Sequence, residues 1–236
     1  MNAITRRGAA GSTLAAALTS LMVLLAGPAT ALTQERTYLP PFEVTYTELS
    51  GCDAPWCSGA ASADPGGALS AEVEAVGAGV GRTDGALASV KFTHTVVEPA
   101  SEISIDLSVH IDAASASAIG APYAQSEAKV ALDVWPTKAS GSYEYVEEIV
   151  AAAESPIGDA DVEGQDLVVS ALLGEGPQVI PAGPIEITVF LLAQTTTMPP
   201  HAAVSGAGCA SSCLGAGSVA ASISGDVRSV TVREIR

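Results

Sequence analysis

The stretch SEISIDLSVHIDA, from Ser101 to Ala113, decides the fold class of this chain. Its alternate positions are aliphatic, and polar residues separate them; the aliphatic set is Ile103, Ile105, Leu107, Val109 and Ile111. Successive side chains of a β-strand point to opposite faces. The pattern therefore predicts a strand with one face on a hydrophobic core and the other in water, as in an antiparallel sheet.

The run before it, ASVKFTHTVV from Ala88 to Val97, has the same period, and Glu98–Ser101 between the two is short and turn-like. We expect the two runs to pair as a hairpin that sets Phe92 against Leu107, because a shift by one residue would turn one apolar set outward. This register places His94 on the apolar face. We interpret it as a buried structural residue that makes a hydrogen bond.

Further alternating runs extend along the chain, at 42–49, 69–80, 128–135, 162–173, 185–197, 218–224 and 227–235. Thr83–Gly85 and Gly225–Asp226 predict tight turns. Tyr143–Glu154 fits a strand or a helical turn, and the small residues of Ala113–Ala121 predict a flexible surface connection. About eight to ten strands without helical periodicity predict an all-β, antiparallel, jelly-roll-like β-sandwich, with a closed β-barrel as the alternative.

The first 31 residues predict a secretory signal peptide. Arg6 and Arg7 precede an apolar run, Leu14–Ala26, and small residues follow at 29–31. The run is shorter than the roughly 20 residues that span a bilayer. We therefore expect a secreted, extracellular protein with no transmembrane anchor and a single β-sandwich domain over residues 32–236.

The charge of the chain excludes one class of partner. It has 26 acidic and 10 basic side chains, a formal net charge of −16. An acidic surface repels phosphate backbones, so we expect no nucleic-acid partner. The charge favours solubility, with divalent cation binding as the sharper alternative. The oligomeric state stays open.

Four cysteines stand in two close pairs, Cys52 with Cys57 and Cys209 with Cys213. The spacing is within the range of zinc ligands, but export leads to an oxidising compartment where disulfides persist. A redox motif would read C-x-x-C beside a βαβ unit, which is not the case here. We predict structural disulfides. Local pairing is favoured because close thiols meet first, and crossed pairing remains open.

One acidic stretch resembles the start of a calcium-binding loop. In Gly158–Asp166, the acidic residues Asp159, Asp161 and Glu163 alternate and Gly164 follows, so that oxygens could converge on a hard cation. Glutamate takes the third place, Ser170 stands where a bidentate glutamate is expected, and no helices flank the stretch. An ordinary acidic surface turn is the alternative. No cofactor other than calcium is predicted.

The sequence predicts no catalytic residue. It has neither the G-x-S-x-G nor the H-E-x-x-H pattern. Trp135, Tyr143 and Tyr145 lie on either side of a predicted turn and could form a small aromatic platform for a glycan. Our leading hypothesis is a non-enzymatic, secreted surface-binding or adhesive module for an extracellular target, glycans included. The alternatives are a structural or envelope-associated protein and a glycoside hydrolase with carboxylate chemistry.

Overall fold

The computed structural model describes residues 32–52, 57–76, 82–119, 124–136, 144–154, 157–174, 179–197 and 218–236. Thr33–Arg236 form one compact unit. Within the described part, the chain has eleven strands, which are β1 (Thr33–Tyr38), β2 (Val44–Ser50), β3 (Cys57–Ala63), β4 (Ala68–Val76), β5 (Arg82–Val96), β6 (Glu102–Ile119), β7 (Ala124–Pro136), β8 (Glu144–Glu154), β9 (Ile157–Leu173), β10 (Gly183–Thr197) and β11 (Ser218–Ile235).

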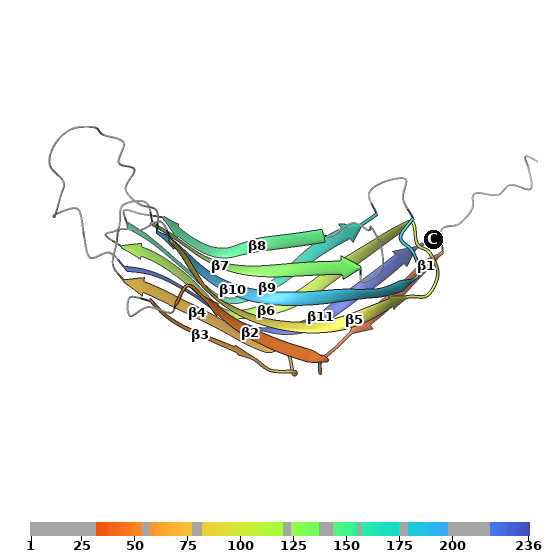
Figure 1. Ribbon diagram of the computed structural model, residues 1–236, viewed down its shortest axis with the longest axis horizontal. Helices are drawn as coiled ribbons and strands as arrows, with labels where there is room; N and C mark the ends of the chain where they lie inside the picture. The colour runs from red at the N-terminus through yellow and green to blue at the C-terminus, as the bar shows by residue number, and fades with distance from the viewer. Residues whose placement is uncertain are drawn as a thin grey trace, which may run out of the picture. The chain divides into compact units, whose positions relative to one another are not determined.

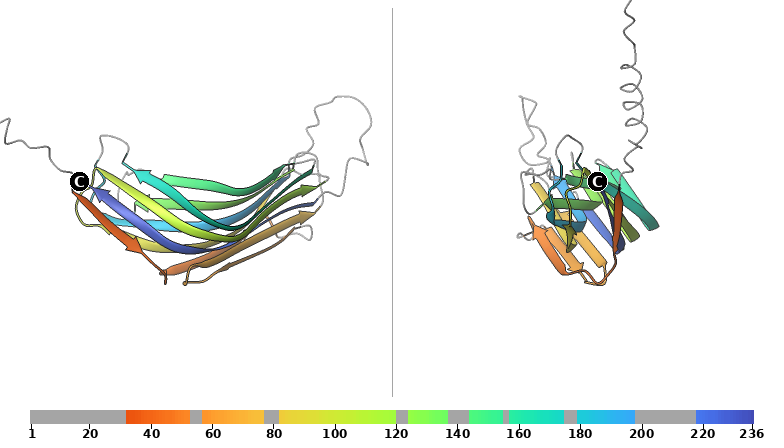
Figure 2. Two further views of the ribbon diagram at one scale, coloured as in Figure 1. Left: turned by 180° about the vertical axis from the view of Figure 1, so that it is seen from behind. Right: turned by 90° about the vertical axis from the view of Figure 1, so that its right-hand side faces the viewer.

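The strands form two sheets that face each other. Sheet B has the order β2-β5-β10-β7-β8 and faces the viewer in Figure 1. Sheet A has the order β3-β4-β11-β6-β9 and is in front in the left view of Figure 2. Strand β11 is long enough to pair with β4 along its first half and with β1 along its second half. The all-β sandwich prediction is therefore confirmed, and the alternative of a single closed sheet is wrong.

The strand order is that of a jelly roll. Strand β4 pairs with β11, β5 with β10, β6 with β9, and β7 with β8, all antiparallel. The chain from β4 to β11 is thus one long antiparallel double strand, with β7 and β8 at its closed end, that is rolled into two sheets. Strands β1, β2 and β3 extend the sheets at β11, β5 and β4.

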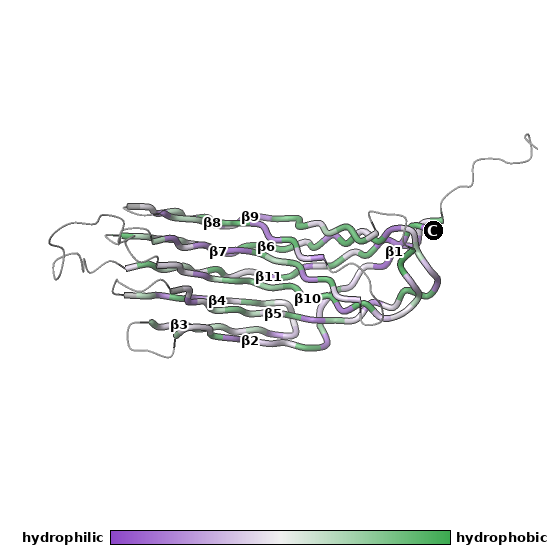
Figure 3. Tube along the Cα trace, turned by 45° about the horizontal axis from the view of Figure 1, so that its top comes forward, coloured by the Kyte–Doolittle hydropathy of each residue, from purple (hydrophilic) through white to green (hydrophobic). Residues whose placement is uncertain are grey.

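The core lies between the sheets and follows the alternation of the sequence. Hydrophobic and hydrophilic residues alternate along the strands in Figure 3. The five aliphatic residues of the 101–113 stretch are each at most 1% exposed. His94 is 3% exposed, in agreement with its predicted place on the apolar face. No helix in the described part is long and apolar enough to cross a membrane.

The predicted hairpin between 88–97 and 101–113 is wrong. These residues belong to β5 and β6, which lie in different sheets. Phe92 pairs with Ile187 of β10, and Leu107 pairs with Val169 of β9 and Val230 of β11. The short connection after β5 carries the chain from one sheet to the other. Both apolar faces therefore line the core, but the two strands are not hydrogen-bonded to each other.

Two segments that the sequence predicts as turns lie inside strands instead. Thr83–Gly85 lie inside β5. At the second, Gly225–Asp226, the pairing with β6 shifts register while β11 continues. The sequence predicted a turn there because glycine and aspartate, which are typical of turns, are also tolerated at a β-bulge.

Two further segments, for which the sequence did not clearly predict a strand, are strands as well. The predicted flexible connection, 113–121, is strand β6 as far as Ile119, with Ala114, Ala116 and Ala118 buried. Glu144–Glu154 are strand β8, not a helical turn.

Candidate functional site

The outer side of sheet B carries the predicted aromatic residues. Along β7, Leu132 and Val134 are buried in the core, so that Asp133 and Trp135 point to the opposite side. Tyr145 of β8 pairs with Asp133 across the ladder. Trp135 is 55% exposed and Tyr145 is 42% exposed. The two rings and the carboxyl group therefore share one solvent-facing surface.

Strand β10 completes this surface. Its residues Thr188 and Glu186 pair with Asp133 and Trp135, respectively. We call the surface formed by Asp133, Trp135, Tyr145, Glu186 and Thr188 the β7–β8 face; the labels of the strands in Figure 1 show where it lies. The alternation along β7, β8 and β10 places all five side chains on the outer side of sheet B.

A lysine from the next strand adds a positive charge. Lys91 of β5 pairs with Thr188, and its Nζ lies 2.5 Å from Glu186 Oε2. This ion pair is about one third exposed on each side, with side-chain exposures of 38% and 37%. It holds the Glu186 carboxylate at the border of the β7–β8 face.

Asp133 is the unusual residue of the face. Its Oδ1 is buried and has no hydrogen-bond partner among the described residues. Burial raises the pKa of Asp133 above its ordinary value, and the charge of Lys91 opposes this only in part. A buried carboxyl oxygen without a partner is energetically unfavourable. Asp133 as a whole is only half-buried, so part of the residue reaches the outer surface of the sheet.

A network of polar side chains adjoins Tyr145 along the sheet. The Tyr145 hydroxyl donates to Glu147 Oε2 at 3.1 Å, and Lys129 Nζ donates to Glu147 Oε1 at 3.3 Å. Lys129 also contacts Glu127 at 2.5 Å. Burial alone would lower the pKa of Lys129, but its hydrogen bonds to Glu127 and Glu147 raise the pKa. The lysine therefore stays charged and holds both carboxylates in place.

Sequence reasoning found part of this surface. The structure brings Trp135 and Tyr145 to one face; Tyr143 lies outside the described residues. Asp133, Glu186 and Thr188 were missed. Asp133 had a signal, because it interrupts the apolar run from Val130 to Trp135 at an outward position. Glu186 and Thr188 had none, since the sequence does not reveal that β10 pairs with β7.

The predicted calcium loop is not a loop. Asp159, Asp161 and Glu163 lie on β9 at successive outward positions, opposite Ser117, Ser115 and Ala113 of β6. Alternate residues of a strand are about 6.5 Å apart, whereas calcium oxygens converge within about 2.6 Å of the ion. Calcium binding by these three residues remains a prediction, and the strand geometry does not favour it.

The first cysteine pair forms the predicted local disulfide. Cys52 and Cys57 are bonded, with their Cα atoms 4.8 Å apart. Cys52 follows β2 of sheet B and Cys57 begins β3 of sheet A, so the bond links neighbouring edges of the two sheets. Cys209 and Cys213 lie outside the described residues.

A buried polar cluster joins β1, β5 and β11. His94 Nε2 lies 2.9 Å from Glu234 Oε1, and His94 Nδ1 lies 2.7 Å from the Tyr38 hydroxyl. The His94 and Glu234 side chains are 4% and 2% exposed. Arg236 donates to the second Glu234 oxygen at 2.8 Å. A neutral imidazole with its proton on Nε2 satisfies every contact, because it donates to Glu234 and accepts from Tyr38.

Comparison with known proteins shows no family. No protein-family model matches the chain. No curated protein matches it. Among solved structures, it is similar to TmCBM61 in complex with β-1,4-galactotriose, with 12% identity over 66% of this chain and 86% of that chain and a TM-score of 0.22.

A second similar structure is the enzymatically active domain of tailspike protein 4 of bacteriophage CBA120. Identity is 12% over 83% of this chain, the TM-score is 0.21, and the match spans 19% of that chain. Both TM-scores are too low to show a common fold, so neither likeness bears on function.

Proposed function

We propose that this protein is a secreted, non-enzymatic surface-binding module that holds a glycan on the β7–β8 face. The observation that carries the proposal is the pair of exposed aromatic residues, Trp135 and Tyr145, beside the half-buried Asp133. The Cys52–Cys57 disulfide is compatible with export to an oxidising compartment.

The chemistry of the face suits a sugar. Aromatic rings combine a large apolar surface with a polar tip, and such surfaces cover the C–H face of a pyranose ring. A sugar hydroxyl could donate a hydrogen bond to the half-buried Asp133 carboxyl group. Apolar stacking and one oriented hydrogen bond together would fix the ring on the sheet.

The charges around the site select among glycans. Asp133, Glu186 and Glu147 lie on or beside the face, and the chain as a whole carries a net charge of −16. Like charges across an interface disfavour binding. We expect a neutral glycan and exclude sulfated or uronic-acid polymers.

A binding experiment with a matched control tests the proposal. A glycan array of neutral oligosaccharides identifies the ligand, and calorimetry with that ligand measures the affinity. The double variant Trp135→Ala, Tyr145→Ala should bind at least about 100-fold more weakly, since two central aromatic contacts are lost. Tyr46→Ala is the control. Tyr46 lies on β2 of the same sheet, is 54% exposed and donates to Glu48 at 3.1 Å, as Tyr145 does to Glu147.

Two other functions are tested by the array and by an activity assay. A protein that binds no glycan on the array supports the structural or envelope-associated alternative. One observation supports a hydrolase, namely that two carboxyl groups lie on neighbouring strands in different environments. The pKa of Asp133 is raised by burial, whereas Glu186 forms an ion pair with Lys91. Carboxyls in such different environments can act as acid and nucleophile or base. Release of sugars from polysaccharides that Asp133→Asn abolishes would establish it.

A further inference from the structure

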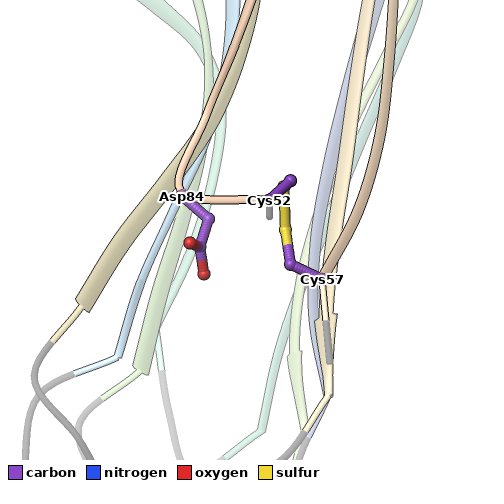
Figure 4. Close-up of side chains that lie close together, drawn as sticks. All are labelled: Cys52, Cys57 and Asp84. Carbon is purple, nitrogen blue, oxygen red and sulfur yellow. A yellow bond between two sulfur atoms is a disulfide. The ribbon is translucent and has the colours of Figure 1, made fainter. Parts of the chain in front are cut away.

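A second cluster of reactive side chains lies at the disulfide, where Asp84 approaches both sulfur atoms. The ligand atoms of Cys52, Cys57 and Asp84 all lie within 4.8 Å of one another. Figure 4 shows the Asp84 carboxylate beside the disulfide. Within the described part of the chain, no other group of three His, Cys, Asp or Glu residues gathers its ligand atoms so closely.

The chain makes room for this carboxylate. Asp84 is 1% exposed, although it is an acidic residue near the start of β5. A Cβ atom at Gly51 would lie 2.2 Å from Asp84 Oδ1, and Gly51 has a φ of 76° that other residues rarely adopt. Glycine at position 51 thus provides both the turn into Cys52 and the space for the Asp84 side chain.

We propose that reduction of the disulfide, in a medium that contains a dithiol reductant, converts this cluster into a binding site for a divalent metal of zinc-like chemistry. A dithiol reductant gives two electrons and two protons to the disulfide, whose S–S bond breaks to leave two thiols, while the reductant becomes a disulfide. The metal ion then displaces both thiol protons to solvent and is bound by two thiolates and the Asp84 carboxylate.

The ligand set defines the metal. Thiolates favour zinc and similar borderline-soft ions, whereas calcium and magnesium favour oxygen ligands only. Two sulfurs and one carboxylate oxygen leave a fourth, tetrahedral position for water. The metal would connect β3 through Cys57, β5 through Asp84 and the residues that follow β2 through Cys52. The edge between the sheets would therefore be held in either redox state.

Metal titration of the reduced protein tests this proposal. The full chain, with Cys209→Ser and Cys213→Ser to remove the other thiols, is reduced, freed of reductant without oxygen and titrated with Co²⁺ and Zn²⁺. We expect one ion per chain, a thiolate-to-cobalt charge-transfer band, and binding that weakens as the pH falls because protons compete. Asp84→Asn should weaken the affinity about tenfold or more. Glu74→Gln, which changes an exposed acid on β4, should leave it unchanged.

Three results would overturn the proposal. These are equal affinity of the oxidised and reduced proteins, equal affinity of Asp84→Asn and Glu74→Gln, and binding without a charge-transfer band. If Asp84→Asn does not fold, thermal unfolding decides instead. Zinc should then raise the melting temperature of the reduced protein but not of the Cys52→Ser variant, and an equal effect on both would reject the site.

Discussion

The buried side chain of His94 makes the stability of the folded protein depend on pH. Burial lowers the pKa of His94 from 6.5, although the hydrogen bond and charge of Glu234 act in the opposite direction. A protonated imidazole would also lose its acceptor for the Tyr38 hydroxyl. The unfolded chain therefore binds this proton more readily than the native one. The corresponding stability is fully present above about pH 6.5 and is lost as the pH falls toward the lower native pKa.

Urea unfolding between pH 7.5 and pH 5 measures this effect. We expect the free energy of unfolding of the wild type to fall with pH more steeply than that of His94→Gln, which does not titrate in this range. His110→Gln is the control, because His110 is on the outer side of sheet A beside Asp166, at 2.7 Å. Equal slopes for the wild type and His94→Gln would refute the assignment.

The sequence predicted where His94 points but not what it binds. The period of two fixes the face of each residue within a strand, which is a local property. Tyr38 and Glu234 lie 56 and 140 positions away along the chain. Such partners follow from strand order, which no local pattern contains. Asp133 had a local signal in the sequence, but its neighbours Tyr145 and Thr188, across two ladders, also follow only from the strand order.

At the scale of the element, strand β6 shows the limit of hydrophobic periodicity. Its first half has large aliphatic residues at each buried position, and the pattern predicted it. Its second half has alanine at the buried positions 114, 116 and 118, with serine between them. Alanine and serine differ little in hydrophobicity, so the alternation carries a weak signal although the burial is complete.

Leucine substitutions at adjacent positions of β6 test this packing. Ala116 is 0% exposed, so Ala116→Leu should destabilise the protein by about 1–3 kcal/mol through overpacking. Ser117 is on the outer side of the sheet, and Ser117→Leu should change the stability by less than about 0.5 kcal/mol. Denaturant unfolding measures both. Equal small effects would be expected of a flexible connection and would contradict the strand.

At the scale of the whole molecule, the fold class could be predicted from the sequence but the pairing of the strands could not. Many short alternating runs without helical period leave few architectures, and the jelly roll is one of them. The pairing of β5 with β6 failed because any two strands with an apolar face are complementary in register. A short connection is equally compatible with a hairpin and with a crossing between sheets, as at Glu98–Ser101.

The net charge of the whole molecule leads to a last prediction. With 26 acidic and 10 basic side chains, repulsion among carboxylates opposes the compact state. Salt screens charges beyond about 10 Å at 0.1 M, so the melting temperature should rise by a few degrees when NaCl increases from about 0.01 to 0.5 M. A fall would show that attractive ion pairs dominate. Calcium chloride at the same ionic strength distinguishes screening from a site. A larger rise with calcium, absent when Asp159 and Asp161 are changed to asparagine, would establish calcium binding there; an equal rise would rule it out.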